Sequence, residues 1–266
     1  EVTWALTQSK TVADPTNDTT GVASPTLAGL SGIDVTVEGT TTTVTQVNAL
    51  ETNYTVGTIT ATLGKQPISV FTNETTGILQ SDNILNLTVT GETGTLTEVT
   101  AADVLAVGAL TSGTITLDNN AGADPKITGS SADVASIYAD DTKYKTTGKA
   151  ESILVLNDVA GTVVQAADLH EIVDGTSKLV TLTNAGTVTI SGKADDITAV
   201  FAESEDTATT TKNKISNITG TDIIVTDLEV SATTLEALVH TGAGGTPVTT
   251  GNVTVISNSV SGDLAA

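Results

Sequence analysis

The residues best suited to chemistry in this sequence are two histidines and two acidic loops, one at residues 118–124 and one at Asp140 and Asp141. His170 and His240 each fall in a stretch with helical spacing of apolar residues, beside the apolar stripe, where side chains face solvent. The motifs H-E-x-x-H, G-x-S-x-G and G-x-G-x-x-G and the phosphate-binding loop are absent from the sequence. We therefore expect neither histidine to be joined to a carboxylate pair in a pocket, and we predict that the chain is not an enzyme.

The first acidic loop contains oxygen donors suited to calcium. Asp118, Asn119, Asn120 and Asp124 lie within one short stretch before Pro125, and carboxylate and amide oxygens are the ligands that calcium prefers. Their spacing is that of neither an EF-hand nor a glycine-rich calcium nonapeptide, and ordinary turns use the same residue types. These four residues are the predicted metal ligands. No other cofactor is predicted.

Acidic residues could also act in glycoside hydrolysis, which requires a carboxylate pair. A polysaccharide-acting β-helix enzyme is therefore the enzymatic alternative. Lyases of that architecture use a Lys or Arg base near calcium, and the ten basic residues of this chain are all lysines. Four aspartates recur three residues after the expected start of a helix, where helix capping explains them. They are Asp103, Asp133, Asp168 and Asp196.

The elements that would position these residues form a repeated unit. In Thr187–Ala202, alternation of Val188 and Ile190 with threonines predicts a strand. Ile197, Val200 and Phe201 then follow at helical spacing. The same apolar stripe recurs at Val47/Leu50, Val104/Val107, Val134/Ile137/Tyr138, Leu169/Ile172/Val173 and Leu235/Leu238/Val239, with a weaker copy ending at Val70/Phe71.

These stripes recur roughly 25–40 residues apart, which is typical of stacked repeat proteins. Each predicted helix spans about two turns, whereas a helix in an ordinary α/β domain is nearer three. Two or three large apolar side chains per helix are too few to cover a sheet without help from neighbouring units. We therefore predict a mainly β fold, an elongated parallel β-solenoid with short helices between strands, over residues 31–266.

Residues 1–30 do not fit the repeat. They contain the single tryptophan, Trp4, in a strand-like start, followed by a loop with Pro15 and Pro25. We expect this segment to cap the first unit or to be exchanged with another molecule as an added strand.

Composition limits which binding partners and which cellular location can be expected for the protein. The formal net charge of −21 disfavours nucleic acid and anionic membrane surfaces, which need dense Lys or Arg. No apolar run approaches the roughly 20 residues of a membrane helix, so we predict no membrane insertion. High acidity suits a secreted protein that must stay soluble, and the chain begins at Glu1, as after removal of a signal peptide. We predict an extracellular or cell-surface location.

Two units carry a family resemblance: Ile127-Thr-Gly-Ser-Ser-Ala-Asp-Val-Ala-Ser-Ile137 and Val163-Val-Gln-Ala-Ala-Asp-Leu-His-Glu-Ile172. They resemble the degenerate repeats of large bacterial secreted surface proteins, which include S-layer-like, adhesin-like and filament-forming proteins. The resemblance covers roughly residues 40–260 and rests on a loose pattern. It implies a structural role outside the cell and supplies no site residues.

The predicted function is therefore that of an extracellular structural protein. It would be a subunit of a surface layer, sheath or filament that self-associates by end-to-end contacts, because an open strand at the end of a repeat stack lacks a partner. The alternative is a glycan- or surface-binding adhesin module with cell-surface glycans as partners.

Overall fold

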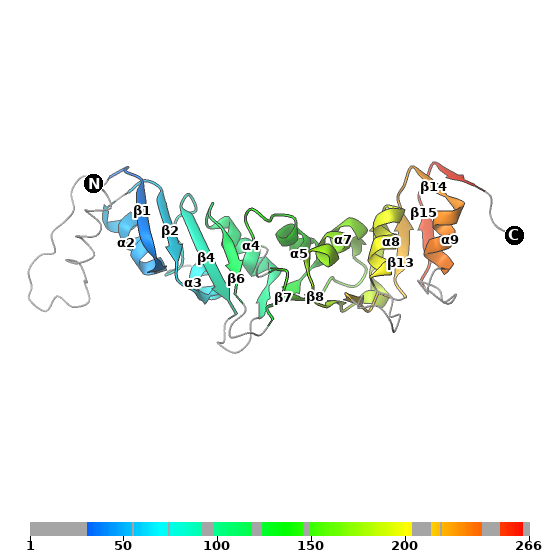
Figure 1. Ribbon diagram of the computed structural model, residues 1–266, viewed down its shortest axis with the longest axis horizontal. Helices are drawn as coiled ribbons and strands as arrows, with labels where there is room; N and C mark the ends of the chain where they lie inside the picture. Colours follow the sequence, from blue (N-terminus) through cyan, green and yellow to red (C-terminus); the bar gives the residue numbers. More distant parts are fainter. Residues whose placement is uncertain are drawn as a thin grey trace, which may run out of the picture.

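The computed structural model of the chain is a row of strand–helix units that follow one another along one long axis (Figure 1). It describes residues 31–54, 56–73, 75–91, 98–118, 124–145, 149–203, 214–218, 220–240 and 251–262. The first and last described strands lie at opposite ends of the molecule (Figure 1). The predicted N-terminal cap, residues 1–30 with Trp4, lies outside the described residues.

Strands and helices alternate along the chain. The helices are α2 (Val44–Tyr54), α3 (Ile68–Thr72), α4 (Ala101–Ala109), α5 (Ser131–Tyr138), α7 (Ala166–Gly175), α8 (Ala194–Ala202) and α9 (Ala232–His240). The strands are β1 (Val35–Thr42), β2 (Ile59–Leu63), β3 (Gln66–Pro67), β4 (Ile84–Thr90), β5 (Glu98–Thr100), β6 (Ile115–Leu117), β7 (Lys126–Gly129), β8 (Ile153–Leu156), β9 (Val163–Gln165), β10 (Val180–Leu182), β11 (Thr189–Gly192), β12 (Ile215–Ser216), β13 (Asp222–Val225), β14 (Glu229–Ser231), β15 (Val253–Val255) and β16 (Ser259–Ser261).

The prediction of a mainly β fold is wrong, and so is the prediction of a β-solenoid. Helices and strands take equal shares of the described residues, about 32% each, and the protein is of the α/β class, with parallel sheets built from alternating strand–helix units. Most strands have only three or four residues, because each turns about two side chains into the core. Most helices have eight to eleven residues, since they start at small buried residues before the apolar stripe.

Those small residues occupy the same place in each unit, the first position of a helix. In α4 the small first residue is preceded by the N-cap residue Thr100. The Thr100 hydroxyl accepts the backbone N–H of Asp103 at 3.0 Å and donates to the Asp103 carboxylate at 2.7 Å. The Thr100 hydroxyl thus caps α4, whereas a reciprocal capping box forms at α2, where the Gln46 N–H donates to the Thr43 hydroxyl at 3.2 Å and the Thr43 N–H donates to Gln46 Oε1 at 3.0 Å. The buried first residues are Ala101, Ser131, Ala166, Ala194 and Ala232.

All strand pairs between the described strands are parallel. The sheets have the orders β1-β2-β4-β3 with β6 beside β4, then β12-β10-β8-β7-β5, then β15-β13-β11-β9, and a two-stranded sheet β14-β16. Within each sheet, a strand pairs with the strand one unit away rather than with a hairpin neighbour. Every unit therefore depends on the next one for its backbone hydrogen bonds.

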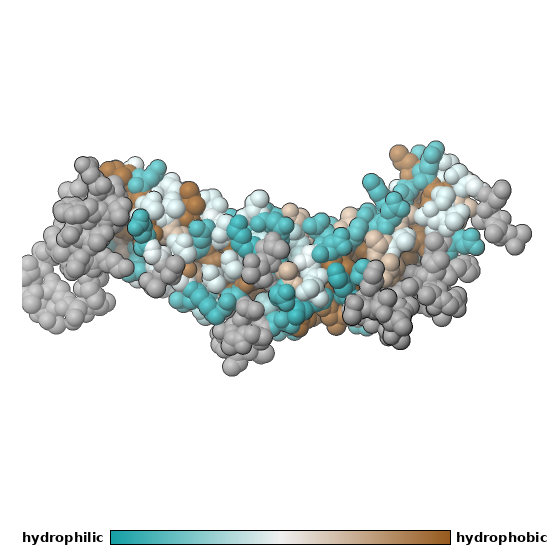
Figure 2. Space-filling model, viewed as in Figure 1, coloured by the Kyte–Doolittle hydropathy of each residue, from teal (hydrophilic) through white to brown (hydrophobic). Residues whose placement is uncertain are grey.

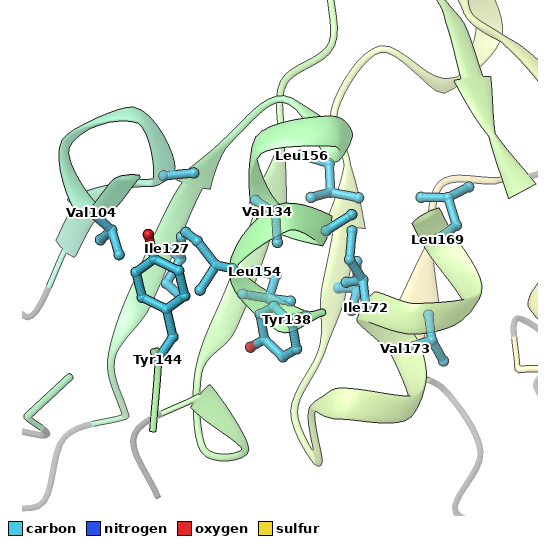
Figure 3. Close-up of a cluster of buried hydrophobic side chains, with 14 of the residues drawn as sticks. Val104, Ile127, Val134, Tyr138, Tyr144, Leu154, Leu156, Leu169, Ile172 and Val173 are labelled. Atoms are coloured by element: carbon cyan, nitrogen blue, oxygen red, sulfur yellow. The ribbon is translucent and has the colours of Figure 1, made fainter. Parts of the chain in front are cut away.

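The core is a set of apolar ladders that run along the stack. In the second sheet, Ile127 is paired in register with Leu154, and Leu154 with Val180, and all three side chains are fully buried. Helices α5, α7 and α8 pack side by side in the same order. Their apolar faces close over the ladder, as the close-up of Val134, Leu154 and Ile172 shows (Figure 3).

The sheet order changes at β8, and an aspartate binds the neighbouring unit at that point. Strand β7 leads directly into α5, but its partner β8 continues into β9, which starts the next sheet and leads into α7. In the intervening loop, the buried carboxylate of Asp158 accepts the backbone N–H of Ser131 at 3.1 Å and its hydroxyl at 3.0 Å. A side chain from one unit thus caps the helix of the preceding unit.

The same change of sheet order, with an aspartate that caps a helix of the preceding unit, occurs at β13. That strand pairs with β11 and continues into β14, while the Asp227 carboxylate accepts the N–H of Ala194 at the start of α8, at 2.7 Å. The N-cap residue of α8, Lys193, makes no capping bond of its own. A cross-unit aspartate therefore replaces the local cap.

Removing a ladder side chain should test the shared core. We expect Leu154→Ala to lower the free energy of unfolding by about 2–5 kcal/mol, because it leaves a cavity between β7 and β10. Val159→Ala is the control, since Val159 is 75% exposed and a surface change of this kind alters stability by only about 0.5 kcal/mol. Chemical denaturation followed by circular dichroism measures both. Equal effects would show that the ladder is not the core.

Removing the cross-unit cap should also destabilise the stack. Asp158→Ala leaves the N–H and hydroxyl of buried Ser131 without their acceptor, which costs about 1–3 kcal/mol. We expect the loss in the same denaturation experiment. Asp174→Ala, at an exposed position on α7, is the matched control, and a similar loss there would contradict the capping role of Asp158.

Candidate functional site

The predicted calcium ligands are divided between ion pairs and residues outside the described part. The Asp118 carboxylate pairs with the ammonium of Lys65, after β2. That of Asp124 pairs with Lys178, before β10, at 3.1 Å. Asn119 and Asn120 lie outside the described residues. The two ends of the loop thus contact units on opposite sides, and each carboxylate has a lysine partner. Calcium binding stays a prediction.

The second acidic loop, at Asp140 and Asp141, forms a turn directly after α5. Asp140 accepts the hydroxyl of Thr142 at 2.6 Å and the N–H of Lys143 at 2.9 Å. These bonds, the Thr142 hydroxyl first, lower the pKa of Asp140. This is a turn held by its own aspartate, so the residue type reflects a structural role here.

Lys149 is the most buried charged side chain of the described part, at 2% exposure. Its ammonium donates to the carbonyls of Ile137 and Tyr138 at 3.1 Å and pairs with Asp141 at 2.5 Å. A cation is favourable beside the unsatisfied carbonyls at a helix C-terminus. The Tyr138 hydroxyl donates to the Lys149 carbonyl at 2.8 Å, and burial raises the pKa of Tyr138.

The ring of Tyr138 needs a glycine in the next helix. A Cβ atom at Gly175, the last residue of α7, would lie 2.3 Å from Cδ1 of that ring. The contact places the aromatic side chain between α5 and α7, where Figure 3 shows Tyr138 near Ile172 and Val173. Lys149, with its ammonium 5.3 Å from the ring centroid, therefore belongs to a packed structural cluster.

His170 does contact two carboxylates, which the sequence analysis did not expect. Its Nδ1 atom lies 3.2 Å from Oδ1 of Asp196 on α8, and its Nε2 atom lies 3.4 Å from Oδ2 of Asp174 on α7. The side chain is 38% exposed on a helix surface. Both ring nitrogens face carboxylates, and the contact with Asp196 links two neighbouring helices. The His240 side chain lies outside what the structure describes.

A shallow surface depression lies near the second change of sheet order. It is lined by Lys193, Thr226, Asp227, Leu228, Glu229 and Asn258. Its polar groups include the carboxylates of Asp227 and Glu229 and the amide of Asn258, and Asp227 is already engaged in capping α8. No sequence motif marks this group, because its members come from three separate segments.

The C-terminal end of the stack differs from its middle. Val230 of β14 is 4% exposed, while its register partner Val260 of β16 is 54% exposed. Ile223 of β13 is buried, whereas its partner Val253 of β15 is only half-buried. Hydrophobic residues are visible among polar ones at this end in Figure 2. Side chains whose counterparts form the core are thus partly exposed here.

The predicted calcium site has a direct test by thermal unfolding. If the loop binds calcium, millimolar calcium raises the Tm of the wild-type protein, because a ligand that binds the native state stabilises it. Asp124→Asn should remove this shift, while Asp174→Asn, on the exposed surface of α7, should retain it. An unchanged wild-type Tm in calcium contradicts the predicted site.

Comparisons with protein-family models, with curated proteins and with solved structures found no match for this chain. In the described residues, no helix is long and apolar enough to span a bilayer. The same residues contain no group of three or more His, Cys, Asp or Glu side chains arranged to hold a metal ion. The exposed apolar side chains of Val260 and Ile256 make the end of the stack at β15 and β16 the candidate functional surface.

Proposed function

We propose that the chain is an extracellular structural protein, a subunit of a surface layer, sheath or filament that associates end to end with further copies of itself. The observation that supports this is the contrast between Val230 and Val260, which share one register position but not the same burial. Ile256, next to β15, is 62% exposed. An apolar strand edge of this kind is a template for pairing with another chain.

The geometry of a parallel stack favours a second copy as the occupant. Among the described strands, β1 pairs with β2 alone and β15 with β13 alone, so each has one free edge. Because all strands point the same way, the edge at one end of the stack matches the hydrogen-bonding pattern required by the edge at the other. A contact of this type is heterologous, and it propagates into a filament unless its rotation closes a ring.

Charge sets the conditions for such association. The formal net charge of −21 makes two copies repel each other at low ionic strength, and salt screens this repulsion. Apolar burial at the strand edge does not weaken with salt. Association should therefore strengthen as ionic strength rises.

The depression at Asp227, Glu229 and Asn258 favours a second function, that of a glycan-binding module. Its carboxylate and amide groups are suited to hydrogen bonds with sugar hydroxyls. A glycan array tests this alternative: a carbohydrate bound by the wild-type protein and lost in Asn258→Ala would support it.

The assembly proposal predicts self-association that depends on the β15–β16 end. Sedimentation and light scattering of the wild-type protein should show particles that grow with protein concentration and with salt. We expect Val260→Lys to reduce this growth strongly, because it places a charge where an apolar contact forms.

Val159→Lys is the matched control, since Val159 is exposed in the middle of the molecule and lies on no free strand edge. Growth equal to wild type is expected for it. A wild-type protein that is monomeric at all concentrations and salt levels, with and without calcium, would contradict the proposal.

A further inference from the structure

Glu51 is a buried acid near the N-terminal end of the stack. It lies on α2 and is 8% exposed. Its Oε1 atom accepts a hydrogen bond from the side-chain amide of Asn83. The Asn83 orientation is fixed, since its Oδ1 atom accepts the N–H of Ile59 at 2.7 Å. The second carboxyl oxygen of Glu51, Oε2, is buried without a hydrogen-bond partner in the described part.

Asn48 presents a second acceptor on the same face of α2. Its amide nitrogen donates to the Gly77 carbonyl at 2.7 Å, so its Oδ1 atom must face elsewhere. That oxygen is also buried without a partner among the described residues. Asn48 and Glu51 are three residues apart in a helix, and side chains with this spacing are neighbours. Two buried acceptors therefore lie one turn apart, with both amide orientations fixed by backbone bonds.

We propose that Glu51 is protonated in the folded protein and that its Oε2–H group donates to Oδ1 of Asn48. A single proton then supplies the donor for both oxygens. Calcium would need six to eight oxygen ligands, and the described residues contain no group of three or more acidic or histidine side chains that could hold a metal. We call this arrangement of Glu51, Asn48 and Asn83 the proton latch.

The charges around the proton latch favour the neutral acid. Glu51 is the one charged residue of α2, and β2, β3, α3 and β4 carry none. Burial raises the pKa of Glu51, the hydrogen bond from Asn83 lowers it, and the negative charge of Asp82 raises it further. Lys65, between β2 and β3, is paired with Asp118 instead.

The proton latch joins three units of the stack. Glu51 belongs to α2, Asn83 precedes β4, and the Ile59 N–H that Asn83 binds belongs to β2. Because the pKa of Glu51 is raised on folding, its stabilising contribution is complete below the unfolded pKa of about 4.3. The contribution is lost as the pH rises through the folded pKa. The N-terminal units should thus be most stable in acid and open more often at higher pH.

Hydrogen exchange of the α2 amides across pH tests the proton latch, after correction for the intrinsic exchange rate. In the wild type, we expect protection to fall by up to about tenfold per pH unit above the Glu51 pKa, the limit for one released proton. Glu51→Gln should keep protection constant, because its amide can donate to Asn48 and still accept from Asn83. Asn48→Ala should lower protection in acid, where the latch is closed.

Glu171→Gln is the matched control, a like substitution at an exposed position of α7, and it should keep the wild-type pH dependence. The same pH dependence in wild type and Glu51→Gln would overturn the proposal. So would lower protection of Glu51→Gln at every pH, because that result means that the ionised form is required. A gain in α2 protection from calcium at neutral pH, lost in Glu51→Gln, would assign the site to a cation instead.

Discussion

Burial that is shared between successive units is the interaction on which the rest of this structure depends. A strand of three or four residues turns only about two side chains inward, and each helix adds two or three. Burying one side chain of this kind is worth roughly 1.5–3 kcal/mol. The few buried side chains of a single unit together contribute less free energy than is lost in conformational entropy when all its residues are ordered. Ile127, Leu154 and Val180 are fully buried because each lies between two others. Cooperation along the stack therefore decides stability.

Polar side chains complete this arrangement where the sheets end. The hydroxyl of Thr176 donates to the Ser152 carbonyl at 2.8 Å and accepts the N–H of Lys178 at 3.1 Å. Buried Thr111 bonds the backbone of Leu85 in the same manner. Asp158 and Asp227 each accept a backbone N–H from the first turn of a helix in the preceding unit. Apart from the bond between Lys178 and Thr176, these bonds join neighbouring units, so buried backbone groups find partners without lengthening the strands.

The sequence predicted the local features of the fold better than its class. Thr100 and Ser130 cap their helices through the N–H of Asp103 and Asp133, as residues three apart can. The helices that contain Asp168 and Asp196 have no side-chain cap bond from their N-cap residues, so the predicted capping role of these two aspartates is wrong. The strand and helix shares were misjudged, since small residues such as Ala166 are buried but carry no hydrophobic signal strong enough to extend a predicted helix. The partners of Asp158 and His170 are 26–27 residues away in sequence. Such pairs follow from the stacking register, which periodicity within one unit does not fix.

Shared burial also explains why apolar side chains are more exposed at the end of the described stack than in its interior. An interior unit has its apolar positions covered from both sides, so substitutions there change stability and leave few exposed groups for recognition. In the last described unit, the same sequence pattern that builds the core yields exposed Val260 and half-buried Val253. At the other end, the acid Glu51 and its neighbour Asn48 lie where α2 meets the loop before β4. Partly exposed apolar side chains and the buried acid Glu51 thus lie near the two ends of the described stack, where local opening is least costly.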